Sequence, residues 1–469
     1  MRYSPYPKYK PTSVEWLGKV PHDWNVKAIK RISPVLRGAS PRPIDDPTYF
    51  DDEGEYAWVR ISDVTSAGMY LNETTQRLSE LGCSLSVKLR PGALFLSIAG
   101  SVGKPCISKI KCCIHDGFVY FPRWKGDTRF LYYLFACGEP YKGLGKLGTQ
   151  LNLNTDTVGA IVTGFPSLSE QLVIANFLDR ETDKIDTLIK KKQELIEKLN
   201  EKRTALISQT VTRGLSPEAA RAAGLNPHPR LKPSGIEWLG EIPDHWETPP
   251  LYTRYAIDLG KMLNEDRITG DYLVPYLRNV DIQWDRINIT DLPEMDIGPR
   301  EHARYTVRTG DLVVCEGGEV GRSAIVTSTA DGLGYQKALH RLRPLTANEI
   351  PRFMFYTMFW AAVKGIFIAE GNPNTIPHLT GEKLRRYRFP APSRPEQEAI
   401  ANTLDIETAK INRLIAKLAE TIDRLHEHRT ALITAAVTGK IDVRHEGEAV
   451  SAAHRDEIKV KMVQECASK

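Results

Sequence analysis

The chain has 469 residues, with 41% hydrophobic and 26% charged residues and a formal net charge of +5. This composition is that of an ordinary globular protein and excludes a fibrous or wholly disordered chain, while so small a charge does not by itself indicate a nucleic-acid partner. The longest nearly apolar stretch, residues 92–100, is too short for a membrane helix, and the aromatic, polar start lacks the apolar segment of a secretory signal.

The seven cysteines are scattered, and no two of them have the Cys-x2-Cys spacing of a zinc site. Dispersed cysteines in an odd number indicate free thiols in a reducing, cytoplasmic compartment. Cys112, Cys113 and His115 lie close together in the sequence. Adjacent cysteines rarely chelate one tetrahedral metal ion, so we expect thiols here and no metal site.

The chain begins with a motif that returns in its second half. Residues 15–24 recur at 237–246 with six of ten positions identical, and residues 170–189 recur at 396–415 with 13 of 20 positions identical. The offset is 222 at the start, 218 between Arg60 and Arg278, and 226 at the later segment, and so small a drift indicates a tandem duplication of one domain and its appendage. The motifs place tryptophans at four repeated positions, and we expect them to pack in cores or against helices rather than to stack on bases: Trp16, Trp24, Trp238 and Trp246.

The first globular part, residues 25–165, is predicted to be α/β. Short β-type runs occupy 57–64, 92–98 and 117–121, and 129–136 is predicted to be a short aromatic helix. Gly100 to Lys104 resembles the end of a phosphate-binding loop, but Ile98 and Pro105 stand where that loop needs Gly and Ser or Thr. A tight turn near a phosphate, or a simple hairpin, is the expected structure.

The first appendage is predicted to be one long helix, because residues 169–211 contain no Gly or Pro and are bounded by Pro166 and Gly214. Apolar residues recur at spacings of three and four in both copies, which favours a coiled coil; an amphipathic helix packed on its own domain is the alternative. The predicted seam consists of Ile185, Leu188, Leu195, Leu199, Leu206, Ile411, Leu414, Leu418, Leu425 and Leu432. Four further isoleucines widen the stripe and predict that something else packs there: Ile189, Ile196, Ile415 and Ile422.

About 40 helical residues would form a rod of about 60 Å. Two such helices that arose by internal duplication should pair about a pseudo-two-fold axis, and an axis that crosses the rod makes them antiparallel. The second globular part, residues 247–389, shares little with the first beyond glycines and a few charged positions. Its basic residues, assigned to loops, include His340, Arg341 and Arg343. We therefore predict two different functions on a common scaffold.

This arrangement resembles the DNA specificity subunit of type I restriction–modification systems. The likeness rests on residues 15–24, on Gly38-x-Ser40-Pro41 and on Trp58-Val59-Arg60-x-x-Asp63. It also rests on the entry into each long helix, Pro-x-x-x-Glu-Gln-x-x-Ile-Ala-x-x-Leu-Asp, at 166–179 and 392–405. The likeness covers about residues 10–440.

The resemblance implies α/β (α+β) target recognition domains, duplicated, each followed by a long helix, with the two helices paired as an antiparallel coiled coil of pseudo-two-fold symmetry. The implied domains are a first target recognition domain at 1–166, a first spacer helix at 167–213, a linker at 214–233, a second target recognition domain at 234–392, a second spacer helix at 393–440 and a loosely ordered tail at 441–469.

The resemblance also implies a non-catalytic chain. Each recognition domain would bind one half of an asymmetric, bipartite double-stranded DNA target, and the helices would set the spacing. Two modification (methyltransferase) subunits would dock on the helices, and two restriction (motor-nuclease) subunits would join them. S-adenosylmethionine, ATP and Mg²⁺ are expected on those partners, and no cofactor is expected in this chain. The alternatives are a coiled-coil scaffold with two protein-binding modules and no DNA role, and an enzyme whose site lacks a recognisable motif.

Loop residues able to contact base edges are the DNA-binding candidates, because arginine pairs with guanine and asparagine or glutamine with adenine in the major groove. In the first domain they are Arg37, Ser40, Arg42, Arg60, Ser62, Ser101, Lys104, Gln150, Asn152 and Asn154. In the second they are Lys261, Arg278, Asn279, Glu319, Arg322, Asn372 and Asn374. The repeated pairs Arg60–Asp63 and Arg278–Asp281 could instead be ion pairs that hold a turn. Met262 and Leu263 replace Ser40 and Pro41, so the same loop need not bind DNA in both domains.

Overall fold

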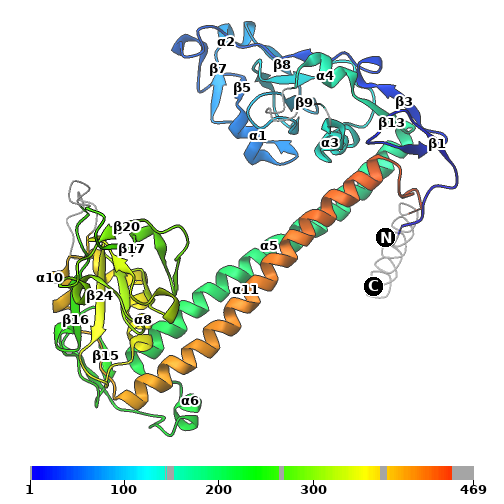
Figure 1. Cartoon of the computed structure of the whole chain (residues 1–469). Helices are drawn as coiled ribbons and strands as arrows, with labels where there is room; N and C mark the ends of the chain where they lie inside the picture. The colour runs from blue at the N-terminus through cyan, green and yellow to red at the C-terminus, as the bar shows by residue number, and fades with distance from the viewer. Residues whose placement is uncertain (1–2, 143, 145–152, 264–268, 370–377, 446–469) are drawn as a thin grey trace, which may run out of the picture. The chain divides into compact units, whose positions relative to one another are not determined.

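The computed structural model describes residues 3–142, 144, 153–263, 269–369 and 378–445. The chain divides into two compact units, residues 1–192 with 420–469, and residues 193–419. Each unit contains one globular head and part of both long helices, α5 (Leu168–Arg213) and α11 (Arg394–Val437) (Figure 1). Among the described residues, no helix combines the length and apolarity that crossing a membrane requires.

The head of the first unit is built around two sheets with buried, apolar strands. The five-stranded sheet has the order β4 (Leu36–Arg37), β12 (Phe118–Tyr120), β9 (Leu94–Ser97), β10 (Pro105–Ser108) and β6 (Tyr70–Leu71). The four-stranded sheet has the order β7 (Gln76–Leu78), β5 (Tyr56–Val59), β11 (Cys112–Ile114) and β8 (Val87–Leu89). All residues of β9, β10 and β11 are buried, which explains their continuous apolar runs and places Cys112 and Cys113 inside the core.

Short helices and two strand pairs complete this head. The helices are α1 (Ile61–Ala67), α2 (Glu80–Ser84), α3 (Thr128–Ala136) and α4 (Thr155–Ala160). The pairs are the hairpin of β1 (Tyr9–Pro11) with β2 (Lys19–Pro21), and β3 (Asn25–Ala28) with β13 (Val162–Phe165). Strand β13 is followed after two residues by α5, so the chain passes directly from the head into the long helix.

The head of the second unit repeats the central strand order of the first. β21 (Leu312–Cys315) pairs with β24 (Leu339–Pro344) and β22 (Ser323–Ile325), as β9 pairs with β12 and β10, and β16 (Tyr255–Leu259) completes the sheet. A three-stranded sheet has the order β20 (Glu294–Asp296), β17 (Leu273–Leu277) and β23 (Gly334–Tyr335). Further elements are α6 (Pro217–Ala222), β14 (Leu231–Pro233), β15 (Glu241–Pro243), β18 (Ile282–Gln283), β19 (Arg286–Ile287), α7 (His302–Tyr305), α8 (Pro351–Val363), α9 (Ile366–Ala369) and α10 (Gly381–Arg386). The common scaffold predicted for the two heads is therefore present.

The expectation that His340, Arg341 and Arg343 lie in loops is wrong. All three belong to β24, where His340 and Arg341 are buried. Arg341 pairs with Asp258, and Arg343 makes two bonds to Asp311, at 2.8 and 2.6 Å. The charges are tolerated inside the sheet because each has a carboxylate partner.

The repeated tryptophans serve packing, as predicted. Trp24 and Trp246 are fully buried, and Trp16 and Trp238 pack against the same two apolar cores. The Nε1–H of Trp24 also donates to Glu170 at the start of α5, at 3.1 Å. Trp24 therefore helps to join the first head to its long helix, and the buried rings of Trp24 and Trp246 are not exposed to a ligand.

The two long helices run antiparallel in each unit. In the first unit, the end of α11 packs on the start of α5, and Arg429 donates to both oxygens of Asp186, at 2.9 and 3.1 Å. In the second unit, Arg203 of α5 donates to Asn412 of α11 at 2.6 Å. Arg203 and Arg429 are repeat equivalents, and so are Asp186 and Asn412. Equivalent residues therefore make the contact between α5 and α11 in both units, as the predicted pseudo-two-fold pairing requires.

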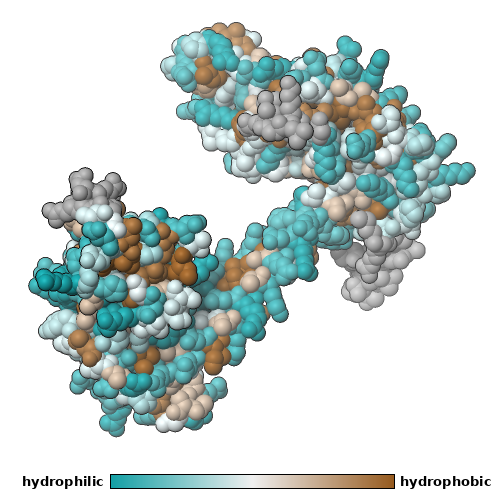
Figure 2. Space-filling view, viewed as in Figure 1, coloured by the Kyte–Doolittle hydropathy of each residue, from teal (hydrophilic) through white to brown (hydrophobic). Residues whose placement is uncertain are grey.

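The predicted seam is wrong at three positions. Leu188, Leu195 and Leu414 are 48%, 45% and 51% exposed. The isoleucine that follows each of them faces inward: Ile189 is buried, and Ile196 and Ile415 are partly buried. At these three positions the helices thus meet through the isoleucine, and the leucine before it is left at the surface. Figure 2 shows that apolar residues occur on the surface of the otherwise polar long helices.

Candidate nucleic-acid interface

In the first head, several strands end at one edge, and their loops meet there. Val119 of β12 lies opposite Arg37 of β4, and Phe118 lies opposite Ser97 of β9. The amide of Ile98 donates to the carbonyl of Gly117 at 2.8 Å, so the loop after β9 touches the loop before β12. Loops that converge in this way can present polar side chains together.

The first group of candidates surrounds Asp116 in the loop before β12. Ser40 donates to Asp116 Oδ1 at 3.0 Å, Arg42 donates to Oδ2 at 2.9 Å, and Arg37 donates through Nε to the Asp116 carbonyl. Burial alone would raise the pKa of Asp116, but the Ser40 hydrogen bond and the Arg42 charge outweigh it and lower that pKa. His115 is partly buried in the same loop, and burial, together with the charges of Arg37 and Arg60, lowers its pKa.

The second group lies where α1 begins beside the turn between β9 and β10. Lys104 Nζ donates to the carbonyl of Thr65 at 2.8 Å, and the hydroxyls of Ser101 and Thr65 lie 3.3 Å apart. Arg60 and Ser62, at the start of α1, are exposed. The turn is a hairpin in which Gly100 and Gly103 have φ of +64° and +82°, a conformation that favours glycine.

The second head repeats this second group with different side chains. Asn279 donates to the Gly317 carbonyl at 2.9 Å and accepts from Arg322 at 2.9 Å. Glu319 lies in the same turn, between β21 and β22. Its Oε1 accepts from the Trp284 indole at 2.6 Å. The structure therefore brings four candidates together here, Arg278, Asn279, Glu319 and Arg322, and adds Trp284.

The repeated Arg–Asp pairs differ between the heads. The backbone amide of each arginine donates to its aspartate at 2.8 Å, so Asp63 and Asp281 hold the same turn. Arg278 also forms a two-bond ion pair with Asp281, at 2.8 and 3.0 Å, as the structural alternative predicts. Within the described part of the chain, the structure records no ion pair for Arg60, which leaves its exposed guanidinium available to a ligand.

The candidate cations of the second head have acidic neighbours. Lys261 contacts Glu301 at 2.6 Å, which lowers the pKa of that carboxyl. Arg322 lies 3.4 Å from Glu319. A phosphate would have to compete with these carboxylates, so this head is less electropositive at its loops than the presence of its cations alone suggests.

Some candidates have another role or cannot be placed. Asn154 caps α4, where its Oδ1 accepts from the Thr157 amide at 2.8 Å. Gln150, Asn152, Asn372 and Asn374 lie outside the described residues. One residue was missed: Val280 is 65% exposed beside Asn279 and occupies the repeat position of Ser62. The offset of 218 between the heads would have identified it.

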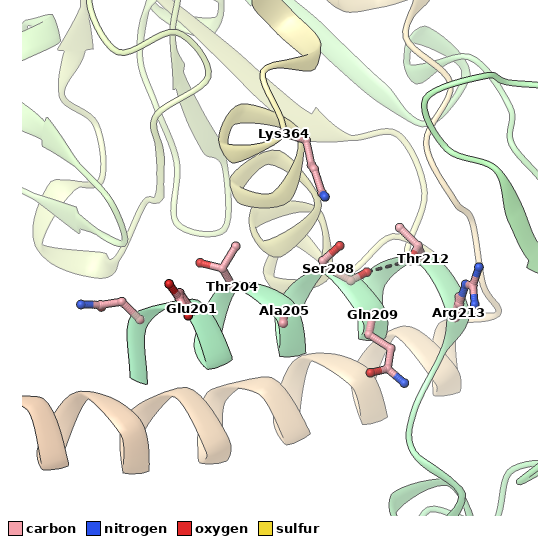
Figure 3. A pocket seen from close by; sticks show the side chains of 9 residues that line it. Glu201, Thr204, Ala205, Ser208, Gln209, Thr212, Arg213 and Lys364 are labelled. Atoms are coloured by element: carbon pink, nitrogen blue, oxygen red, sulfur yellow. Dashed lines mark hydrogen bonds between the residues drawn. The ribbon is translucent and has the colours of Figure 1, made fainter. Parts of the chain in front are cut away.

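A second kind of surface feature is duplicated on the long helices. In the second unit, an open groove of about 720 Å³ follows α5, and Figure 3 shows Lys364, at the end of α8, pointing toward that helix. In the first unit, a groove of about 650 Å³ follows α11. The first is lined by Asn200, Glu201, Thr204, Ala205, Ser208 and Gln209, and the second by their repeat equivalents His426, Glu427, Thr430, Ala431, Thr434 and Ala435. The two grooves are therefore lined by equivalent positions of the repeat.

Comparisons with known proteins agree with this two-headed architecture. The family model for the type I restriction modification DNA specificity domain matches residues 21–198 and 257–424. The chain is 28% identical over 191 residues to the MjaIX type I restriction enzyme specificity subunit of Methanocaldococcus jannaschii; the match covers 39% of this chain and 43% of that relative. The chain thus spans less than half the length of that curated relative.

Two solved structures share the fold. One, from work on complex assembly and conformational transition of the type I R-M system, has a TM-score of 0.64 at 16% identity and covers 90% of this chain and 99% of that chain. The other, the HsdS subunit from Thermoanaerobacter tengcongensis, has a TM-score of 0.53 at 15% identity and covers 90% of this chain and 98% of that chain. At such identities, the likeness concerns the fold.

Proposed function

This chain belongs to the family of type I restriction–modification DNA specificity domains, and from that premise we propose that it directs such a complex to a bipartite DNA target. The observation that carries the proposal is the repeated loop group at the same strand ends of both heads. The two groups share a position but differ in side chains, with Ser62, Ser101 and Lys104 in one head and Val280, Glu319 and Arg322 in the other. Two heads with unlike groups suit two unlike half-sites.

The chemistry of the loops suits base edges and phosphates. An exposed arginine such as Arg60 can donate two bonds to guanine, an asparagine such as Asn279 can pair with adenine, and an apolar side chain such as Val280 can contact a thymine methyl group. Glu319 can accept from the amino group of cytosine. Serine and lysine contacts to phosphate would position the duplex without selecting its sequence.

We further propose that the long helices dock two methyltransferase subunits, one at each repeated groove. The exposed Leu188 and Leu414 are repeat equivalents and offer apolar area that the helix pair itself does not bury. Catalysis would then lie with the partners, which would bring S-adenosylmethionine, and motor-nuclease subunits would bring ATP and Mg²⁺. The assembly would work in the cytoplasm, on the DNA of its own cell.

The test is a map of methylated adenines in the source genome, with and without this chain. Loss of methylation at one split motif is the expected result, and it would also identify the target. Charge reversal at Arg60 should reduce methylation of the same motif while the chain still co-purifies with its methyltransferase. An unchanged methylation map, together with a chain that purifies without a methyltransferase, would refute the proposal.

A further inference from the structure

Each head is bonded to its long helix by a polar junction that appears twice in the chain. In the first unit, the Tyr133 hydroxyl of α3 donates to Asp179 of α5 at 2.7 Å and lies 3.2 Å from the Thr182 hydroxyl. Arg129, one turn earlier on α3, donates to the other oxygen of Asp179 at 2.7 Å. Gln171 of α5 accepts from the Asp127 amide at 3.0 Å, just before α3 begins.

The second unit has the same Tyr–Arg–Asp–Thr–Gln side chains at its junction. Tyr356 of α8 donates to Asp405 of α11 at 2.6 Å and lies 3.2 Å from the Thr408 hydroxyl. Arg352 donates to Asp405 at 2.6 Å. Gln397 accepts from the Ile350 amide at 3.0 Å. The head residues repeat at an offset of 223 and the helix residues at 226, although the heads around them have diverged.

Most of the side chains that form the hydrogen bonds of the junction are buried. Tyr133, Tyr356, Thr182 and Gln397 are almost fully buried. Burial raises the pKa of both tyrosines, and their aspartate partners raise it further, so each hydroxyl keeps its proton and donates it. Hydrogen bonds between a neutral donor and a carboxylate are stronger and more restrictive in angle than apolar contacts, which have no direction.

We propose that these junctions are positioning elements, which fix the orientation of each head on its helix and thereby make the complex selective for the gap between the half-sites. This inference rests on the function proposed above. Changing the gap by one base pair moves a half-site by about 3.4 Å and turns it by about one tenth of a turn. A head held by a rigid junction cannot follow that change, whereas a loosened head can.

The experiment uses the complete complex and the bipartite motif identified by methylation mapping. The double variant Tyr133→Phe with Tyr356→Phe removes both hydroxyls and keeps both rings in the cores. Tyr132→Phe is the matched control, because Tyr132 is the neighbour of Tyr133 on α3 and its hydroxyl has no hydrogen-bond partner among the described residues. Methylation rates are measured on duplexes with the native gap and with gaps one base pair shorter and longer.

We expect the preference for the native gap over the altered gaps to fall by about tenfold in the double variant, as loss of two hydrogen bonds to carboxylates allows, and to stay unchanged in the control. Discrimination against single base changes within either half-site should persist. An equal loss of rate at every gap would assign the junction a merely stabilising role and overturn the inference, as would an unaltered gap preference. A wild-type complex that methylates no bipartite motif would instead refute the proposed function, and this inference with it.

Discussion

Replacing Ile189 with alanine should destabilise the first unit much more than replacing its neighbour Leu188. Both are apolar residues of α5. Because they are adjacent and face different sides of the helix, comparing the two substitutions tests which face meets α11. Ile189 is 6% exposed and belongs to the apolar core against which Ile422 and Leu425 of α11 pack, whereas Leu188 is 48% exposed. The sequence periodicity alone predicts the opposite assignment.

The magnitude follows from burial. Isoleucine to alanine removes three carbons, and at about 0.8 kcal/mol per buried methylene the transfer loss is about 2.4 kcal/mol. The cavity left behind adds to this, so about 3 kcal/mol is expected for Ile189→Ala. Leu188→Ala removes the same number of carbons from a half-exposed side chain, so its cost should be about 1 kcal/mol or less.

Urea unfolding of the chain, monitored by circular dichroism, measures the difference in stability between the two variants. A separate binding assay with the methyltransferase measures how each variant affects partner binding. Leu188→Ala should leave the unfolding midpoint nearly unchanged but weaken methyltransferase binding, since the exposed leucine is proposed to meet that partner. Leu414→Ala should repeat this behaviour in the second unit. If Leu188→Ala and Ile189→Ala lower the midpoint equally, the assignment of the seam to the isoleucines is refuted.

Three other outcomes are expected. Arg60→Ala should weaken specific DNA binding by about 1–3 kcal/mol in a titration and leave the melting temperature unchanged. Arg278→Ala should weaken binding and also lower the melting temperature, because it breaks an ion pair. Equal shifts in melting temperature for the two variants would contradict this expectation. Asp311→Asn should destabilise the second unit by about 3 kcal/mol in urea, because the partly buried Arg343 loses its carboxylate partner; a loss below about 1 kcal/mol would mean that Arg343 finds another partner or solvent. Burial lowers the pKa of His340, so as pH falls the unfolded chain takes up a proton at this residue before the folded chain does. The contribution of His340 to stability should therefore be full above about pH 6.5 and decline below it. The urea midpoint of a His340→Gln variant should depend less on pH over this range.

Much of the architecture follows from local pattern. The duplication, the two long helices and their antiparallel pairing are all visible in repeated motifs and in the absence of glycine and proline. The phase of the seam is not, because Leu188–Ile189 and Leu414–Ile415 place two apolar residues side by side. A spacing of three and four fits either member of each pair, and only the neighbouring helix determines which of the two is buried.

Prediction of the site was limited by pairings between residues far apart in the sequence. Charged side chains are rarely buried, so the sequence predicts loop positions for Arg341 and Arg343. Their partners, Asp258 and Asp311, come from other strands and cannot be inferred from spacing. The loop candidates fared differently, because residues that directly follow a strand gather wherever the strands end together. The positions of Arg60 and Arg278 directly after strands were predictable in this way. Their contact with DNA stays a prediction, and the ion pair of Arg278 was one of two alternatives.

Under the proposed function, both halves of the chain assign positioning and specificity to different residues. The head side chains that bond to Asp179 and to Asp405 are identical in both copies, as Tyr133 and Tyr356 are, while the loop residues Lys104 and Arg322 differ in type and in partners. A duplicated domain that diverged without constraint would have lost the junction as readily as the loops, since both are networks of a few polar side chains. The junction must therefore do something that both heads need in the same form. Holding a head at a fixed angle is such a requirement, because it depends on the helix and not on the bases that the loops are proposed to contact.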